Sequence, residues 1–568
     1  MKRPAIFLLI GILCAGIGWA AYEGAVPAAP PLSKYVPAGA LLYLEAKDFS
    51  SLLSDWNASS QKQDWLKSSN YEAFSRSRLF LRLKGASDEF AAAAGLPPDA
   101  NFLSQMAGSQ SVLALYDIGN LQFLYVTRLP STRSMQTALW QSRATFEPRS
   151  VGTASFYLRR DPDSKKEVAF AISGDYVLLA TREDLLAGAL TLMSGGEGRG
   201  IESEPWWSQS VASAGNAGDL RMVLNLEKIV PSPYFRTYWI QQNITDMKRY
   251  SAAVTDLFRT AQEYREERVL LKAGTTSNTF SAENFQAVAD LVRLVPDDAG
   301  LYEAQAAPST ESCLGLLESK LLAPHLGPPP PSQTAPEARL TPGETGAASD
   351  LETRIDEAPV QGPAAAQSKS SLTELLRRAG VLAMLHVQST QRESAGVFVR
   401  MHSAVALAAT SDWDDVAVRS ALVDFVRTDL TASRLGMSWQ QRSGYYSLDG
   451  LWPLMTAVRG KYLLVSDDSA LMEAMLAGLT RKSELKPAVF VAGLSHTRER
   501  ANFGRLSGVL DRPNTAPPNT PPVLREPQFF SDNLASLSST LGGVSAENVV
   551  VRDAGDKVLQ TVTYRWSQ

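Results

Sequence analysis

Short apolar runs rich in β-branched and aromatic residues recur through the first half of the chain. Their length and composition are typical of β-strands, because such side chains pack well on a pleated, half-buried surface. DIGN at 117–120, between two of these runs, has the composition of a hairpin turn. The pattern therefore predicts hairpins in a mostly antiparallel sheet. The runs are ALLYLEA (40–46), SVLALYD (111–117), LQFLYVTR (121–128), ASFYLRR (154–160), EVAFAIS (167–173), YVLLATR (176–182) and RMVLNLE (221–227).

Other segments carry leucines and further apolar residues at helical spacing. Thr181 followed by Asp184, and Ser466 followed by Ser469, stand where a helix N-cap belongs after a strand. Because hairpins and helices mix without Gly-rich βαβ turns, we predict an α+β protein. The helical segments are 47–59, 182–193 and 244–267.

Two stretches far apart in the chain open in the same way. YVPAGALLYLEAKDFSSLLSDW starts at residue 35 and LVPDDAGLYEAQAAPSTESCLGLLES at residue 294. Later segments match in the same order: SVLALYD with GVLAMLH, GDYVLLATREDL with GKYLLVSDDSAL, LRMVLNLEKI with PAVFVAGLSH, and EERVLLK with AENVVVRD. Several weak matches in one order indicate duplication. We predict two tandem copies of one module, at 35–285 and 286–568.

A segment at 324–369 interrupts the second predicted module. Pro, Gly, Ala, Ser and Thr dominate it, and it has few large apolar residues. Such a segment cannot bury enough surface to offset the entropy of ordering it, so we predict a disordered insertion. The alternative is a binding segment for a proline-recognising partner, because its PPPP run favours polyproline II.

The N-terminus predicts export. Lys2 and Arg3 precede an uncharged run that ends before Glu23, which is typical of a signal peptide or membrane anchor at 1–24. The run is just long enough to span a bilayer. A Pro- and Ala-rich spacer at 25–34 follows. We expect the rest of the chain to lie outside the cytoplasmic membrane, tethered by this helix, or to be periplasmic or secreted if the helix is cleaved.

VPAGALLYLEAKDFSSLLSDW, GDYVLLATREDLLAGAL and LRMVLNLEKI together resemble a bacterial domain-of-unknown-function family of exported proteins. Its members have a similar VPA…ALLYLE opening and a GDYLLLA strand-to-helix turn. The resemblance covers most of 34–272 and, more faintly, 290 to the C-terminus. It implies an envelope location and supplies no functional residues.

Composition narrows the classes of function. The chain has 568 residues, a net charge of -4 and 45% hydrophobic residues, which suits at least two globular cores. There is no basic stripe of the kind that binds nucleic acid, so we expect no nucleic-acid partner. The chain has two cysteines, and we interpret Cys313 as a small buried hydrophobic residue.

The sequence offers no catalytic, metal or cofactor motif. A Gly-x-Ser-x-Gly elbow and a phosphate-binding loop are both absent, so we assign no catalytic residues and no cofactor. The four histidines show no metal-ligand spacing. A zinc site made by His386, His402 and a carboxylate is an alternative to ordinary hydrogen-bonding histidines near strand ends.

Aromatic residues give the one hint of a binding surface. Two tryptophans follow a Gly-rich loop, and four further aromatics lie along one face of a predicted helix. They form either a core seam or a surface for a partner or ligand. The first function hypothesis is a non-enzymatic binding or scaffold module with an envelope protein partner. The alternative is an extracytoplasmic hydrolase with an unrecognised active site. The aromatic residues are Trp206, Trp207, Tyr234, Phe235, Tyr238 and Trp239.

Overall fold

The structure is a computed structural model, and it divides into two compact units. The first unit holds residues 1–259 and 266–275, and the second holds 260–265 and 276–568. No helix in the described part of the chain is long and apolar enough to cross a membrane. The described residues are 30–233, 247–274, 280–322, 371–391, 400–430, 438–449, 453–499 and 543–566.

The first unit is built on one antiparallel sheet with the strand order β4-β5-β6-β7-β3-β2-β1-β8-β9, and β10 follows β9. Neighbours in the sheet are often neighbours in the chain, as in the β2–β3 hairpin. The strands are β1 (Leu42–Ala46), β2 (Ser111–Asp117), β3 (Gln122–Arg128), β4 (Glu147–Val151), β5 (Ala154–Arg160), β6 (Glu167–Ser173), β7 (Tyr176–Ala180), β8 (Leu220–Asn225), β9 (Tyr250–Arg259) and β10 (Glu263–Lys272).

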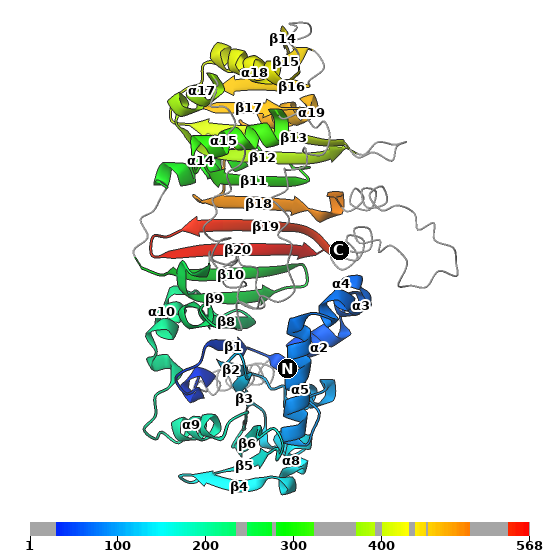
Figure 1. The fold of residues 1–568 in the computed structure, drawn as a ribbon, viewed down its shortest axis with the longest axis vertical. Coiled ribbons are helices and arrows are strands. Elements are labelled where there is room, and N and C mark those ends of the chain that lie inside the picture. Colours follow the sequence, from blue (N-terminus) through cyan, green and yellow to red (C-terminus); the bar gives the residue numbers. More distant parts are fainter. Residues whose placement is uncertain are drawn as a thin grey trace, which may run out of the picture. The chain divides into compact units, whose positions relative to one another are not determined.

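Helices cover both faces of this sheet (Figure 1). The first face packs on α9 (Glu183–Met193), α10 (Pro205–Ser213) and the 3-10 turn η1 (Leu32–Tyr35). The second face packs on α5 (Arg78–Ala94), α6 (Ala100–Met106) and α8 (Ala138–Gln141). Because side chains alternate along a strand, each central strand contributes to both cores. The short helices α2 (Phe49–Ala58), α3 (Ser60–Lys67) and α4 (Ser69–Ser75) lie between β1 and α5 in the chain.

The second unit has an antiparallel sheet with the order β14-β15-β16-β17-β13-β12-β11-β18-β19-β20. The strands are β11 (Leu301–Ala306), β12 (Val381–Gln391), β13 (Arg400–Ala409), β14 (Ser438–Gln441), β15 (Tyr446–Asp449), β16 (Leu454–Arg459), β17 (Tyr462–Ser466), β18 (Phe490–Ser495), β19 (Val544–Asp553) and β20 (Lys557–Trp566).

Helices cover both faces of the second sheet as well. One face packs on α14 (Ala282–Val292) and α19 (Ser469–Gly478). The other packs on α15 (Thr310–Leu317), the π-helical turn η4 (Glu318–Leu322), α17 (Ser371–Ala379) and α18 (Asp415–Leu430). The predicted α+β class and the antiparallel sheet are therefore confirmed.

The helix predicted over 244–267 is wrong, because strands β9 and β10 occupy most of this segment. Its Ala, Glu, Arg and Leu residues favour a helix locally, but tertiary pairing overrides that preference. β9 pairs with β8, and Asp256 lies directly opposite Arg221. The side chains of this pair form two hydrogen bonds of 2.8 Å inside the protein, which a helix could not provide.

Several predicted boundaries also move. The units divide near residue 275, whereas the predicted 285/286 boundary falls inside α14, which packs on β11 and β12. The helix N-caps are Arg182 and Asp468 instead of Thr181 and Ser466. The N-terminal segment and the insertion at 324–369 lie outside the described residues, and so does His325.

His386 lies within β12, where it is buried and its Nε2 has no hydrogen-bond partner in the described structure. Burial, with the positive charge of Lys320, lowers the pKa of the imidazole to about 4. In the unfolded chain this imidazole has the ordinary histidine pKa of about 6.5. The contribution of His386 to the unfolding free energy is therefore fully present above pH 6.5, and it is lost as the pH drops from 6.5 towards 4.

We expect this histidine to make the unfolding free energy of the second unit fall by about 3 kcal/mol over that range, from a difference of about 2.5 pKa units. His386→Leu should remove this part of the pH dependence, whereas His496→Gln should retain it. Hydrogen exchange of β12 peptides at pH 7 and pH 4 measures the effect. Equal pH dependence in the wild type and His386→Leu would contradict this assignment.

Candidate functional site

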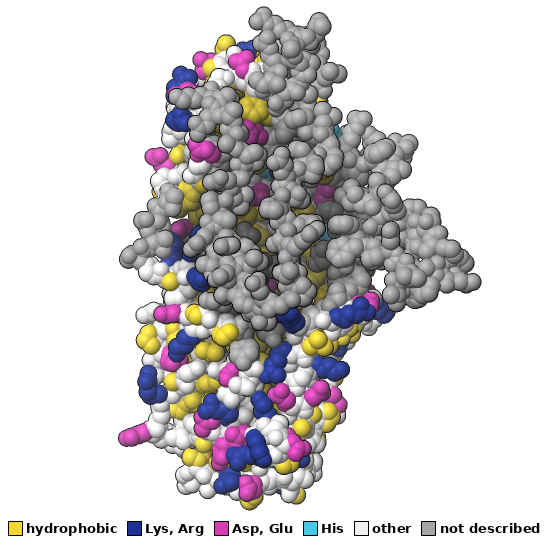
Figure 2. Space-filling view, viewed as in Figure 1, with side chains coloured by type: hydrophobic (Ala, Val, Ile, Leu, Met, Phe, Trp, Pro, Cys, Tyr) yellow, Lys and Arg dark blue, Asp and Glu magenta, His cyan; other side chains and the backbone are white. Residues whose placement is uncertain are grey.

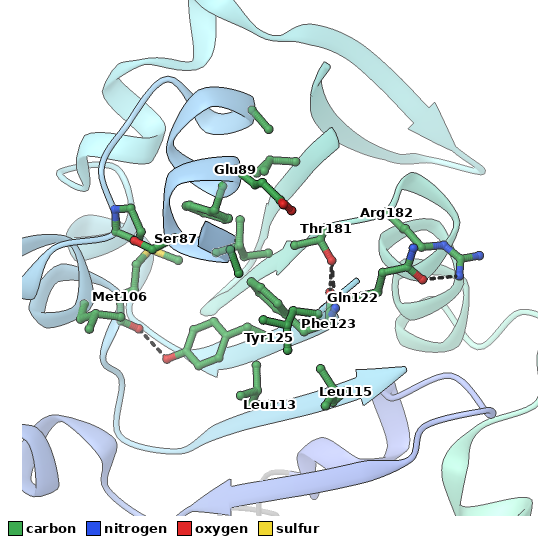
Figure 3. Close-up of a pocket in the computed structure, with 18 of the residues that line it drawn as sticks. Ser87, Glu89, Met106, Leu113, Leu115, Gln122, Phe123, Tyr125, Thr181 and Arg182 are labelled. Atoms are coloured by element: carbon green, nitrogen blue, oxygen red, sulfur yellow. Dashed lines mark hydrogen bonds between the residues drawn. The ribbon is translucent and has the colours of Figure 1, made fainter. Parts of the chain in front are cut away.

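The second face of the first sheet is incompletely covered, and the gap forms a cavity of about 730 Å³ (Figure 3). It lies between helices α5 and α6 and the strands β1, β2 and β3. Volumes of roughly 300–1,000 Å³ are typical of small-molecule sites. We therefore treat this cavity as the candidate functional site.

Leucines from two neighbouring strands form one wall of the cavity. Leu42 and Leu44 of β1 lie opposite Leu115 and Leu113 of β2, and all four side chains line the cavity and remain half-buried. The intervening residues, such as Tyr43, point to the other face and are buried in its core. Strand alternation thus places a row of leucines on the side that the helices leave open.

Helix α5 forms the facing wall and is fixed at both ends. The Ser77 hydroxyl accepts a hydrogen bond from the Phe80 amide at the N-terminus. At the C-terminus, Gly95 adopts a left-handed conformation with φ 70°, and Arg159 donates to the carbonyls of Ala92 and Ala93.

Two phenylalanines join the helix to the sheet inside the cavity. Phe90 of α5 stacks on Phe123 of β3, with ring centroids 6.3 Å apart. Both residues line the cavity, and Phe90 also packs edge-on against Phe102 of α6. This contact fixes the distance between the helix and β3, while β1 and β2 lie beyond it with their leucines uncovered.

The hydroxyls at one end of the cavity are already paired. Tyr125 donates to the Met106 carbonyl at 2.8 Å, and the Ser111 and Thr127 hydroxyls lie 2.6 Å apart. Burial raises the pKa of the Tyr125 phenol, which keeps it neutral. Among the described residues that line the cavity, those at this end carry no charge. Figure 3 shows Tyr125 and Met106 there.

Charged groups gather at the other end. The two carboxylate oxygens of Glu89 lie 3.3 Å from Arg82 Nη1 and 3.4 Å from Lys166 Nζ. Arg182 donates to the Gln122 side chain at 3.0 Å, and the Phe123 amide donates to Thr181 at 2.9 Å. Figure 3 shows Glu89, Gln122 and Arg182 on this side.

The cavity reaches the surface. Leu83 and Leu103 line it and are 46% and 41% exposed, respectively. Further exposed leucines on α5 are Leu79 and Leu81. In Figure 2, hydrophobic side chains reach the surface of the first unit at several places, with Lys and Arg side chains between them. An apolar molecule could therefore enter without the sheet opening.

Two of the six predicted aromatic residues are half-buried and pack against the core of the first unit. Trp206 and Trp207 belong to α10 and pack against the first face of the sheet. Trp206 donates to Glu204 at 2.8 Å, and Trp207 contacts the buried Tyr43 edge-on. Neither lines the cavity. The other four, Tyr234, Phe235, Tyr238 and Trp239, lie outside the described residues.

The predicted zinc alternative is not assembled. His386 lies opposite Val405 and His402 lies opposite Ser389, so the two histidines are on opposite faces of the β12–β13 pair. No group of three potential metal ligands occurs among the residues that the structure describes. The interpretation of Cys313 is confirmed, since it is fully buried and burial raises its thiol pKa to about 11.

The residues of α5 that line the cavity were not predicted from the sequence, because no helix was expected at 78–94. A signal was present: Leu79, Leu83 and Phe90 recur at helical spacing between Ser77 and Gly95, which are typical cap residues. The strand residues were predicted, but not which of their two faces would stay open.

No protein-family model matches this chain, and no curated protein matches its sequence. Among solved structures, crystal forms III and I of TP0453 align with a TM-score of 0.24 and sequence identities of 10% and 11%. The alignments cover 44% of this chain and 83% and 82% of TP0453. At these values the similarity carries no argument about fold or function.

Proposed function

We propose that this chain is an exported, membrane-anchored protein without enzymatic activity, whose first unit binds an apolar small molecule. The observation that carries the binding function is the cavity of about 730 Å³ lined by leucines and phenylalanines. Exposed apolar side chains in a concave site favour a ligand that removes them from water, at about 25 cal/mol per Å² buried.

The corresponding face of the second unit supports a dedicated site in the first. There, the strand side chains Met384, Val405 and Leu407 are buried beneath α15, η4, α17 and α18. In the first unit, Leu113 and Leu115 stay half-buried on the same side of the sheet. In the second unit, leucines of the covering helices fill the space over this face of the sheet. The architecture therefore does not by itself require the cavity that the first unit contains.

We also propose that the two units are copies of one module. Each strand from β1 to β10 has its counterpart ten numbers later at the same place in the strand order. Thr181 and Asp467 accept hydrogen bonds from the amides of Phe123 and Ser403, respectively, at equivalent places. Gly174 and Gly460 both have φ 56° before β7 and β17.

One of the sequence matches between the two proposed modules is wrong. EERVLLK falls in β10, whereas AENVVVRD falls in β19. By strand order, the counterpart of β19 is β9, so these two segments are not equivalent.

The proposed location rests on Lys2, Arg3 and the apolar run that follows them. A reporter enzyme that is active only outside the cytoplasm, fused after residue 568, should be active and sediment with membranes. An inactive reporter, with the fusion protein recovered intact in the cytoplasm, would contradict the proposal.

The hydrolase alternative gains no support from the residues that the structure describes. His402 Nδ1 lies 3.5 Å from Asp467, and burial raises the pKa of this carboxyl. However, Asp467 accepts a hydrogen bond from a strand amide, and the uncharged Thr181 accepts the equivalent hydrogen bond in the first unit. This link accounts for the position of Asp467 without catalysis.

The binding function can be tested with N-phenyl-1-naphthylamine, a neutral apolar fluorophore. Titrated into the full-length protein, it should show saturable, blue-shifted fluorescence with one site per chain, because the described cavity excludes much of the water around it. A linear, non-saturating signal like that of buffer would overturn the proposal. An envelope protein partner remains a separate prediction from the sequence.

A further inference from the structure

We infer that the ligand of this cavity is a single-headed anionic amphiphile, such as a long-chain carboxylate. This inference rests on the proposed binding function and adds the chemistry of the ligand. Its basis is the unequal distribution of polar groups between the two ends of the cavity.

Strand register defines those ends. At one end Leu42 lies opposite Leu115, which lies opposite Phe123. At the other, Ala46 lies opposite Ser111. Four residues of strand separate the two ends, which corresponds to about 13 Å. An extended alkyl chain can therefore lie along the leucine row with its two termini in different environments.

The charged side chains among the described lining residues lie at the Phe123 end. Arg182 donates a hydrogen bond to the Gln122 side chain, and the Phe123 amide donates one to the Thr181 hydroxyl. Lys166 lies 3.4 Å from the Asn120 side chain in the β2–β3 turn. The lining residues at the Ser111 end are uncharged: Ala46, Phe49, Met106, Ser111, Tyr125 and Leu220.

Cations outnumber carboxylates at the charged end. The lining residues, the partners to which they are paired, and Asp117, which interacts electrostatically with Lys166, together contribute five cationic side chains and four carboxylates. The local balance is therefore positive by one charge. A positive rim attracts an anionic head group and repels a cationic one. The cations are Arg82, Arg160, Lys165, Lys166 and Arg182, and the carboxylates are Glu89, Asp117, Glu167 and Asp184.

Lys166 is the cation best placed to receive the head group. Glu89 has a second cationic partner, Arg82, so it stays paired when Lys166 turns towards a ligand. Glu167 is held by Arg160 at 3.1 Å, and Lys165 donates to the Pro162 carbonyl. When a ligand carboxylate replaces Glu89 at Lys166, Glu89 keeps its ion pair with Arg82, and Glu167 keeps its ion pair with Arg160.

The Ser111 end of the cavity has no use for a second charged head group. The hydroxyls of Tyr125, Ser111 and Thr127 bond to one another or to backbone carbonyls. A second charged group placed there would lose its hydration without gaining an ionic partner. The cavity thus suits a chain with a methyl terminus at this end.

The test displaces N-phenyl-1-naphthylamine from the full-length protein with dodecanoate, dodecan-1-ol or dodecylamine, each below its micelle-forming concentration at pH 8. Dodecanoate should compete at least about tenfold better than the alcohol, and the amine worst, because only the acid gains the Lys166 contact. Lys166→Met should bring dodecanoate to the level of the alcohol, whereas Lys166→Arg should retain the preference.

Lys84→Met is the matched control, because Lys84 is exposed on α5 and does not line the cavity. It should leave all three competitors unchanged. If the alcohol competes as well as the acid in the wild type, the anionic head group is wrong while apolar binding stands. If the probe itself does not bind saturably, the proposed function fails as well. A preference for the amine would reverse the assigned charge.

Discussion

Replacing Ala86 with tryptophan is expected to raise the Kd of the full-length protein for N-phenyl-1-naphthylamine at least about a hundred-fold. Ala86 lies on α5 and lines the cavity. An indole there occupies space that the ligand needs. Keeping roughly 110 Å² of apolar ligand surface in water costs about 2.8 kcal/mol at about 25 cal/mol per Å². That energy corresponds to about a hundred-fold in Kd.

Lys84→Trp provides the control, because the same side chain is then added to the exposed side of the same helix. Its Kd should stay within about twofold of the wild type. Thermal unfolding of both variants shows whether the fold is intact. A folded Ala86→Trp protein that binds the probe with wild-type affinity would place the binding site elsewhere.

The largest expected effect on stability comes from Asp256→Ala, which should lower the unfolding free energy of the first unit by about 3–5 kcal/mol. Asp256 and Arg221 are 4% and 9% exposed, and two hydrogen bonds of 2.8 Å join them. Asp256 also accepts from the Gly218 amide at 3.0 Å. Its removal leaves a buried guanidinium without its carboxylate, and an amide without its acceptor.

Hydrogen exchange of peptides from β8 and β9 isolates this effect, since a chain of two units need not unfold in one step. Glu147→Ala is the comparison, because it removes an exposed ion pair with Arg149 and should cost less than about 1 kcal/mol. Replacing both Arg221 and Asp256 with leucine should cost less than Asp256→Ala alone. A single-variant cost below about 1 kcal/mol would contradict the role given to the pair.

The sequence predicted the strands of the first unit well, because their apolar runs are short and separated by turns such as DIGN. It failed at 244–267, where alanine, glutamate and arginine imitate a helix. The strand there depends on Arg221, which lies about thirty-five residues before Asp256 in the chain. Local spacing cannot reveal such a partner.

The cavity could not be predicted for a related reason. Leu42, Leu44, Leu113 and Leu115 have the same apolar character as fully buried strand residues of the second unit. Whether a helix covers them depends on where α5 packs, and that depends on the contact between Phe90 and Phe123. An unfilled space is a property of packing between elements and has no pattern of its own.

The proposed function requires an apolar molecule to bind between α5 and the strands β1 to β3. The most direct measurement is photocrosslinking of the full-length protein with a dodecanoate that carries a diazirine near its methyl end, followed by peptide mapping. Adducts should saturate with concentration and fall on peptides containing Phe49, Met106, Ser111 or Leu220, which line the uncharged end. Adducts spread over both units, or absent from all peptides that line the cavity, would contradict binding there, whereas adducts confined to the charged end would reverse only the orientation of the ligand.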